Sequence, residues 1–267
     1  MKNGSLVVVG SGIITPAHLS QESINRIVSA DIVHLLVPDP LGKAAIEQLN
    51  CNIKDMGDLY YDDSSGRNGN NRVEAYDRMV DSIMADLRKG LKVCAVFYGH
   101  PGVFVYPSHK CISIARKEGF SAEMLPAISA EDCLFADLGI DPGDLGCQSY
   151  EATQYLIYHP PVNLASPLIL WQIGVVGDLT FTQMHPADNG LAMLKARLLE
   201  RYAETHELIL YEAPTLPLMP VRAEPIMLAN LDFVEVKTIT TLYLPPCQTP
   251  RVDLDFCSQW HIDLTLV

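Results

Sequence analysis

Hydrophobic and polar residues alternate in blocks along the first half of the chain, and this pattern predicts strands and helices in turn. Short apolar runs at 6–9, 32–37 and 93–97 predict strands that are buried on both faces, as parallel strands are. Apolar residues at helical spacing predict helices between these runs, beginning near positions 20, 40, 73 and 108. The alternation predicts an α/β fold with a mostly parallel sheet covered by helices on both faces.

The pattern changes near residue 126, where we expect a boundary between two lobes. Further elements are expected beyond it, with helices at 129–138 and 191–202 and strands at 168–173, 208–211, 233–236 and 241–244. The hairpin-like spacing of the last strands predicts a mixed sheet. We therefore predict an N-terminal α/β lobe at 1–126, a C-terminal α/β lobe at 127–246 and a short tail at 247–267. The cleft between the two lobes is the expected ligand site.

The composition is that of a folded protein with an acidic surface. Of 267 residues, 48% are hydrophobic, and 32 acidic residues outnumber 19 basic ones to give a net charge of −13. Such a surface repels phosphate backbones and anionic lipids, so we expect no nucleic-acid or membrane partner. The first apolar run is too short for a signal peptide, and no run approaches the ~18 residues of a membrane-spanning helix. These features predict a cytoplasmic protein.

The cysteines argue against two kinds of stabilising site. There are seven of them, widely scattered, and no two form a C-x-x-C pair. An odd number at such spacing fits neither a zinc site nor the disulfide framework of a secreted protein. We predict buried, reduced thiols and no structural metal.

A glycine pair follows the first predicted strand and raises the question of a dinucleotide. Gly10-Ser11-Gly12 begins the corresponding fingerprint, but Thr15 stands where a third glycine is required and Pro16 follows it. The acidic residue expected at the end of the second strand is matched only loosely, by Asp39. A tight turn that needs small residues explains the pair equally well, so the sequence does not predict NAD.

The string Tyr98–Phe104, YGHPGVF, lies at the carboxyl end of a predicted buried strand. Open α/β sheets bind their ligands at this edge. Two glycines and a proline make a fixed loop whose backbone a small molecule can approach closely, although a purely structural turn is the alternative. A second loop ends in Ser129, which we expect to cap the next helix.

A polar segment separates Tyr60 and Tyr61 from Arg72, which opens the long helix predicted from residue 73. Arg72 and Tyr76 are four residues apart and therefore lie on the same helix face. A cation in the first turn opposes the helix dipole, and a substrate oxygen could offset that cost. The alternative is a solvated arginine beside a core tyrosine.

Taken together, these strings resemble the tetrapyrrole methylase superfamily, and within it the borosin peptide α-N-methyltransferases most closely. The resemblance covers about residues 4–246. Its most specific parts are Tyr98–Phe104 with Pro107-Ser108-His109, Ser129–Pro142, Tyr150-Glu151-Ala152, and the pair Arg72 and Tyr76. The resemblance implies a two-lobed fold that binds S-adenosylmethionine between the lobes, releases S-adenosylhomocysteine, and methylates backbone amides of a ribosomally made precursor.

Two departures refine this expectation. Ile13-Ile14-Thr15-Pro16 replaces the Gly-Asp-Pro loop of tetrapyrrole enzymes, which argues against a porphyrinoid substrate. The fungal borosin enzymes continue into a helical clasp and their own substrate peptide, whereas little sequence follows Pro246 here. The chain therefore resembles the split bacterial type, which implies a precursor supplied in trans. It also implies a homodimer, which would form a heterotetramer with two precursors.

The resemblance also implies roles for individual residues. The catalytic set would be Tyr61, Arg72, Tyr76 and Tyr98, with Tyr60 as the alternative to Tyr61 because the intervening loop is longer than expected. The residues expected to hold the cofactor are Tyr98, His100, Val103, Phe104, Ser129, Ala130, Gln172, Tyr211, Ala213 and Thr241.

These residue types suit methylation of an amide. The amide nitrogen is a weak nucleophile, so charge must be stabilised on the carbonyl oxygen as the proton leaves. Arg72 and the hydroxyl of Tyr76 could form an oxyanion hole, while Tyr61 could accept or relay the proton. Methylation of a tetrapyrrole or another small molecule, a catalytically silent peptide-binding protein and a nucleotide-binding oxidoreductase are the alternatives.

Overall fold

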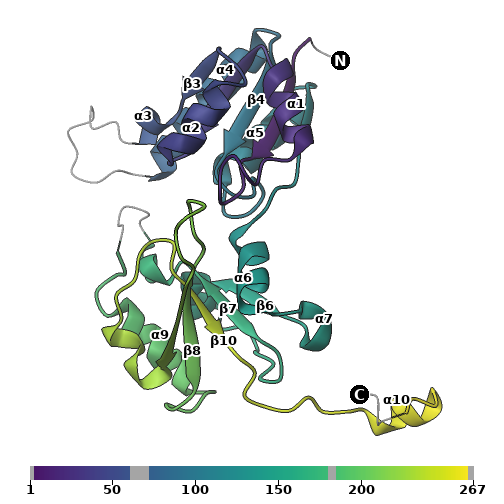
Figure 1. Cartoon of the computed structure of the whole chain (residues 1–267), viewed down its shortest axis with the longest axis vertical. Helices are drawn as coiled ribbons and strands as arrows, with labels where there is room; N and C mark the ends of the chain where they lie inside the picture. The colour runs from purple at the N-terminus through teal and green to yellow at the C-terminus, as the bar shows by residue number, and fades with distance from the viewer. Residues whose placement is uncertain (1–2, 61–71, 180–184, 264–267) are drawn as a thin grey trace. The chain divides into compact units, whose positions relative to one another are not determined.

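The computed structural model describes residues 3–60, 72–179 and 185–263 (Figure 1). The chain divides into two compact units that are not contiguous in sequence. The first unit comprises Met1–Ile140, Asp178–Gln183 and Glu212–Arg222, and the second comprises Asp141–Gly177, Met184–Tyr211 and Ala223–Val267. The first unit thus extends to Ile140, beyond the boundary at residue 126 that the sequence pattern suggested.

The first unit is built on a five-stranded parallel sheet with the order β3-β2-β4-β1-β5. Every observed strand pairing in it is parallel, which confirms the predicted sheet. The central strands consist almost entirely of buried apolar residues because helices cover both of their faces. The strands are β1 (Ser5–Gly10), β2 (Ile32–Leu36), β3 (Ile53–Asp55), β4 (Lys92–Phe97) and β5 (Ser121–Met124).

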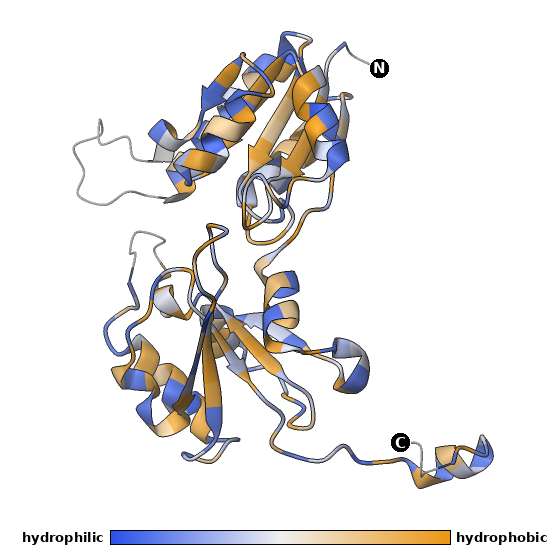
Figure 2. Cartoon of the chain, viewed as in Figure 1, coloured by the Kyte–Doolittle hydropathy of each residue, from blue (hydrophilic) through white to orange (hydrophobic). Residues whose placement is uncertain are grey.

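Two helices cover each face of this sheet. Helices α4 (Arg72–Arg88) and α5 (Tyr106–Lys117) bury their apolar residues against one face, in a core that includes Met79, Ile83 and Cys111. Helices α1 (Gln21–Ser29) and α2 (Pro40–Glu47) cover the other face through Ile27 and Ile46. Figure 2 shows the sheet as largely apolar and these helices as amphipathic. Two further helices of this unit are α3 (Gly57–Tyr60) and α6 (Ala130–Leu138).

The second unit contains a mixed five-stranded sheet with the order β6-β7-β10-β8-β9. Strands β6 and β7 are parallel, whereas β10 is antiparallel to both β7 and β8, as the sequence predicted. The strands are β6 (Gln148–Glu151), β7 (Leu168–Trp171), β8 (Glu207–Glu212), β9 (Arg222–Met227) and β10 (Thr241–Leu244). The helical segments are α7 (Pro142–Leu145), α8 (Ala152–Tyr158), η1 (Ile173–Val175), α9 (Gly190–Leu199), η2 (Leu228–Phe233) and α10 (Leu254–Gln259).

Three sequence-based expectations are wrong in detail. The strand predicted at 233–236 is absent from the described residues, and the 3-10 helix η2 ends there instead. Its Leu228 and Leu231 are both fully buried, a spacing of three that suits this helix type rather than a strand. The tail at 247–267, in which no element was predicted, contains α10, capped by Asp253. All seven cysteines are free, but Cys51 and Cys247 are exposed rather than buried.

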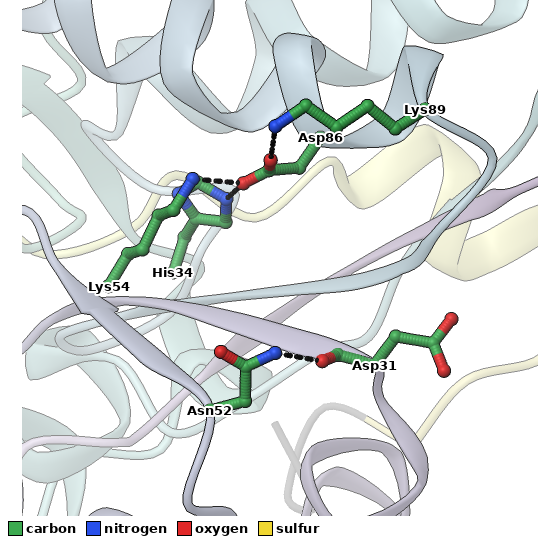
Figure 3. Close-up of polar contacts among 6 residues, drawn as sticks. All are labelled: Asp31, His34, Asn52, Lys54, Asp86 and Lys89. Atoms are coloured by element: carbon green, nitrogen blue, oxygen red, sulfur yellow. Dashed lines mark hydrogen bonds and ion pairs between the residues drawn. The ribbon is translucent and has the colours of Figure 1, made fainter.

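A buried carboxylate joins three basic side chains between the first sheet and α4 (Figure 3). Asp86 is 1% exposed and accepts hydrogen bonds from Lys54 Nζ (2.6 Å), Lys89 Nζ (2.8 Å) and His34 Nε2 (3.0 Å). His34 is fully buried, and its Nδ1 has no hydrogen-bond partner among the described residues. A neutral imidazole that donates from Nε2 satisfies this arrangement, because a charged ring would leave a second N–H buried without an acceptor.

No helix in the described ranges is long and apolar enough to cross a membrane.

Candidate functional site

Three loops meet at Gly10, at the carboxyl edge of the first sheet. A Cβ atom added at Gly10 would lie 2.1 Å from the carbonyl oxygen of Gly99, 2.6 Å from Cβ of Ala127 and 2.7 Å from Cδ of Pro101. These neighbours belong to the loops that follow β4 and β5, while Gly10 itself ends β1. The glycine is therefore required for close packing of the three loops, and it brings the predicted loop at 98–104 next to the segment that leads to Ser129.

The glycine loop begins with Gly10-Ser11-Gly12, and its backbone amides already have hydrogen-bond acceptors within the protein. Ser11 N donates to the Phe97 carbonyl (2.8 Å) and Gly12 N to the Gly99 carbonyl (3.2 Å). The amides of Ile13 and Ile14 both donate to Nδ1 of His18, each at 3.2 Å. A dinucleotide site needs such amides for its pyrophosphate, so this loop does not provide that cradle. His18 could not be identified from the sequence, because nothing in the local pattern marks it as an acceptor for these amides.

The loop Tyr98–Phe104 is held in one conformation by its own polar groups. His100 Nδ1 accepts from Gly102 N (2.9 Å), and Val103 N donates to the His100 carbonyl (3.1 Å). Gly99 and Phe104 have φ values of 71° and 56°, in the left-handed region, which is unusual for phenylalanine. Such backbone strain often accompanies ligand sites. Val103 and Phe104 are 44% and 54% exposed, so the loop presents apolar surface at the sheet edge.

Tyr98 keeps its proton at physiological pH. It follows β4 directly, and its backbone N donates to the Leu36 carbonyl (3.0 Å). Burial raises the pKa of Tyr98 to about 12, and Cys133 and Asp39 add to the effect. A phenol with this pKa can donate a hydrogen bond or align a substrate, but it is a poor candidate for a base at neutral pH.

Ser129 caps α6 as predicted, and the structure adds a partner that the sequence analysis did not name. The Ser129 hydroxyl accepts from Asp132 N (3.2 Å), while the Asp132 carboxylate accepts from Ser129 N (2.6 Å) and from the Ser129 hydroxyl (2.7 Å). This reciprocal capping box fixes the start of the helix, where Ala130 is the first residue. The side chain of Ser129 is thereby committed to the cap, so its contribution to a ligand site would be one of shape and backbone groups.

Three other predicted cofactor residues lie together at one edge of the second sheet. Thr241, at the start of β10, pairs with Tyr211 on β8. Gln172 follows β7 with a left-handed φ of 59°, and the next amide, that of Ile173, donates to the Thr240 carbonyl (3.1 Å). The side chains of Tyr211 and Thr241 are almost fully buried. Ala213, one residue after β8, falls in the first unit.

The predicted catalytic residues are described only in part. Arg72 is the first residue of α4, and Tyr76 follows one turn later on the same helix, half-buried against the core of the first unit. The side chain of Arg72 lies outside the description. Tyr61 lies outside the described residues altogether, and of Tyr60 only its place as the last residue of α3 is described.

No group of three or more His, Cys, Asp or Glu side chains in the described part of the chain is arranged to hold a metal ion.

Comparison with known families gives a match over most of the chain. The sequence pattern of the Tetrapyrrole (Corrin/Porphyrin) Methylases matches residues 5–219. This range contains the glycine loop, the loop at 98–104, α4 and α6.

Several curated proteins are similar to this chain over nearly its whole length. A methyltransferase and precursor of the cyclic gymnopeptides from Gymnopus fusipes is 41% identical over 256 residues, covering 94% of this chain. The corresponding omphalotin A protein of Omphalotus olearius is 39% identical over 95% of this chain. This chain spans 60% of the length of each of these two relatives, in which methyltransferase and precursor are one protein. A type III borosin precursor protein of Anomoporia bombycina is 40% identical, and the match spans 28% of its length.

Solved structures share the fold at low sequence identity. A uroporphyrin-III C-methyltransferase from Thermus thermophilus matches with a TM-score of 0.59 at 18% identity, covering 92% of this chain and 93% of that one. A cobalt precorrin-4 methyltransferase matches with a TM-score of 0.62 at 12% identity, covering 90% of this chain and 94% of that one. A structure of the Thermus protein with S-adenosyl homocysteine also matches, with a TM-score of 0.59.

Proposed function

We propose that this chain, which belongs to the tetrapyrrole (corrin/porphyrin) methylase family, transfers methyl groups from S-adenosylmethionine to backbone amides of a ribosomally made peptide. The observation that carries the proposal is the identity of 39–41% over more than nine tenths of the chain to proteins that are named as methyltransferases and cyclic-peptide precursors.

The residues at the edge of the first sheet fit S-adenosylmethionine better than a nucleotide cofactor. S-adenosylmethionine has no phosphate, and the amides that would bind a phosphate are already used by His18 and two backbone carbonyls. The fixed loop at 98–104 offers strained backbone and exposed apolar side chains to a ligand. The residues that would hold the cofactor are Tyr98, His100, Val103, Phe104, Ser129, Ala130, Gln172, Tyr211, Ala213 and Thr241.

Gly10→Ala tests this assignment without altering any proposed contact residue. The added methyl group would meet a backbone oxygen at 2.1 Å, so the three loops must separate. We expect the affinity for S-adenosylhomocysteine, measured by calorimetry, to fall at least about tenfold, with overpacking also costing about 1–3 kcal/mol of stability. Gly119→Ala is the control, because its methyl group meets nothing within 4 Å and adds backbone strain alone. Equal affinity in Gly10→Ala and the wild type would contradict the assignment.

The chemistry would be carried by two residues of α4, by Tyr61, and by Tyr98, which follows β4. When bound, S-adenosylmethionine supplies an electrophilic methyl group on a sulfonium ion. Arg72 and the Tyr76 hydroxyl, one helical turn apart, would stabilise the negative charge that forms on the amide oxygen as the N–H proton leaves. Tyr61 would accept or relay that proton. Tyr98, which stays protonated, would align the amide by a hydrogen bond.

The precursor arrangement is a separate part of the proposal. The named relatives carry methyltransferase and precursor in one protein. We propose a homodimer that accepts the peptide in trans.

The test is a methylation assay with a defined acceptor. The purified chain is incubated with S-adenosylmethionine and a synthetic peptide that copies the precursor segment of the omphalotin A relative, and tandem mass spectrometry locates the added methyl groups. We expect increments of one methylene mass on backbone nitrogens. Uroporphyrinogen III is the competing acceptor, and methylation of it but not of the peptide would overturn the proposal. Methylation only after the peptide is fused to the chain would show that the trans arrangement is wrong.

A further inference from the structure

Tyr106 lies where the proposed cofactor loop meets the helix that carries Arg72 and Tyr76. It is the first residue of α5 and follows the loop at 98–104 by two positions. Its ring centroid is 6.2 Å from that of Tyr76, with the ring planes tilted by 35°. Tyr106 is 46% exposed, so it is a surface tyrosine that packs with one side against a proposed catalytic residue.

Hydrogen bonds join the first turn of α5 to the loop at 98–104. The Ser108 hydroxyl donates to the carbonyl of Pro101, which belongs to the loop, and also contacts the Val105 carbonyl at 2.7 Å. Nε2 of His109 lies 2.9 Å from the carbonyl oxygen of Gly102, also in the loop. The position of Tyr106 is therefore set by the same backbone that would contact the cofactor.

A second contact joins α4 and α5 beside the two tyrosines. Lys110, one turn after Tyr106, places its Nζ 2.7 Å from Oδ1 of Asp77, the residue that follows Tyr76. The same ammonium lies 5.2 Å from the centroid of the Tyr106 ring, within the range of a cation–π interaction. Hydrogen bonds to Asp77 and Tyr106 raise the pKa of Lys110, so the ammonium stays protonated at neutral pH. Tyr76 and Asp77, which are adjacent on α4, thus contact Tyr106 and Lys110, which lie on one face of α5.

We propose that Tyr106 is a positioning residue, which transmits the conformation of the cofactor loop to Tyr76 by packing against its ring. This inference rests on the proposed function, in which the Tyr76 hydroxyl stabilises the amide oxygen. Oxyanion stabilisation depends on precise placement of the donor, because small displacements of a reacting group cost large factors in rate. The contact between the two tyrosines that carries this role is the one between their rings.

The test compares Tyr106→Ala with Tyr106→Phe in the peptide methylation assay at saturating S-adenosylmethionine. We expect Tyr106→Ala to lower kcat about tenfold, with the affinity for S-adenosylhomocysteine and the melting temperature close to those of the wild type. Tyr106→Phe keeps the ring contact and should retain the wild-type kcat. Tyr158→Ala is the matched control, because Tyr158 is a 75% exposed tyrosine on α8 with no place in the proposed site.

A double-mutant cycle separates action through Tyr76 from a general structural effect. If Tyr106 acts through the Tyr76 hydroxyl, then adding Tyr106→Ala to Tyr76→Phe should produce little further loss. Losses that multiply would overturn the positioning role, and so would a wild-type kcat in Tyr106→Ala or an equal loss in Tyr106→Phe. A wild-type enzyme that does not methylate the peptide would instead overturn the proposed function, so the two failures are distinguishable.

Discussion

A Tyr76→Phe variant is expected to methylate its peptide about 100-fold more slowly than the wild type. Removal of one donor from an oxyanion site typically costs ~3 kcal/mol of transition-state stabilisation. Phenylalanine keeps the packing of the ring against the core and against Tyr106, so the fold should be unchanged. Single-turnover rates with bound S-adenosylmethionine measure the chemical step directly, and calorimetry with S-adenosylhomocysteine should give the wild-type affinity.

Two further variants test whether the loss is specific to the proposed donors to the amide oxygen. Arg72→Ala should show a loss in the same direction, because the guanidinium is the second proposed donor to the same oxygen. Tyr158→Phe removes a hydroxyl from an exposed tyrosine on α8 and should leave the rate unchanged. Wild-type rates in both Tyr76→Phe and Arg72→Ala would refute the oxyanion roles, even if the peptide proves to be the substrate.

Asp86→Ala is expected to destabilise the protein by about 1–3 kcal/mol. The buried carboxylate is the common partner of Lys54, Lys89 and His34. Its removal leaves the N–H of the fully buried His34 without an acceptor, whereas the lysine side chains are 46% and 64% exposed and can be solvated. Urea denaturation measures the change in the free energy of unfolding. Asp81→Ala, on the exposed face of the same helix, should change it by less than about 0.5 kcal/mol. Similar values for the two variants would show that the network contributes little.

The hydrogen bonds around Asp86 also make the free energy of unfolding depend on pH in the acid range. Burial alone would raise the pKa of Asp86, but hydrogen bonds from Lys54, Lys89 and His34 lower it from 3.8 to about 2. The stabilisation, about 2 kcal/mol, is present above pH ~4 and is lost as the pH falls toward 2. Burial lowers the pKa of His34, and this effect outweighs the opposing effect of Asp86. The stability that depends on a neutral His34 is therefore fully present above pH 6.5, the pKa of the unfolded state, and declines below it. Wild-type stability should therefore fall on acidification, and the loss near pH 2–4 should be much smaller in Asp86→Ala.

The sequence predicted the three central strands of the first sheet well, because they are largely buried and read as apolar runs. It did not predict the edge strand β3 (Ile53–Asp55), which is short and only partly buried. It could not predict β9 (Arg222–Met227), whose residues are mostly exposed and include a proline, so no alternation marks the strand. The loop at 98–104 was evident from its glycines and proline. The roles of His18 and Tyr106 depend on contacts that only the folded chain creates, and Asp86 looks like any surface aspartate until its neighbours are known.

The discontinuity of the two units has a consequence for synthesis of the chain. Glu212–Arg222 belongs to the first unit, yet most of the second unit precedes it in the sequence. During translation, the amino-terminal unit cannot be completed until the ribosome has passed residue 222, so it must wait, partly assembled, for its last segment. Neither unit can be produced on its own by trimming the gene from one end, because the shortened chain would still carry segments of the other unit.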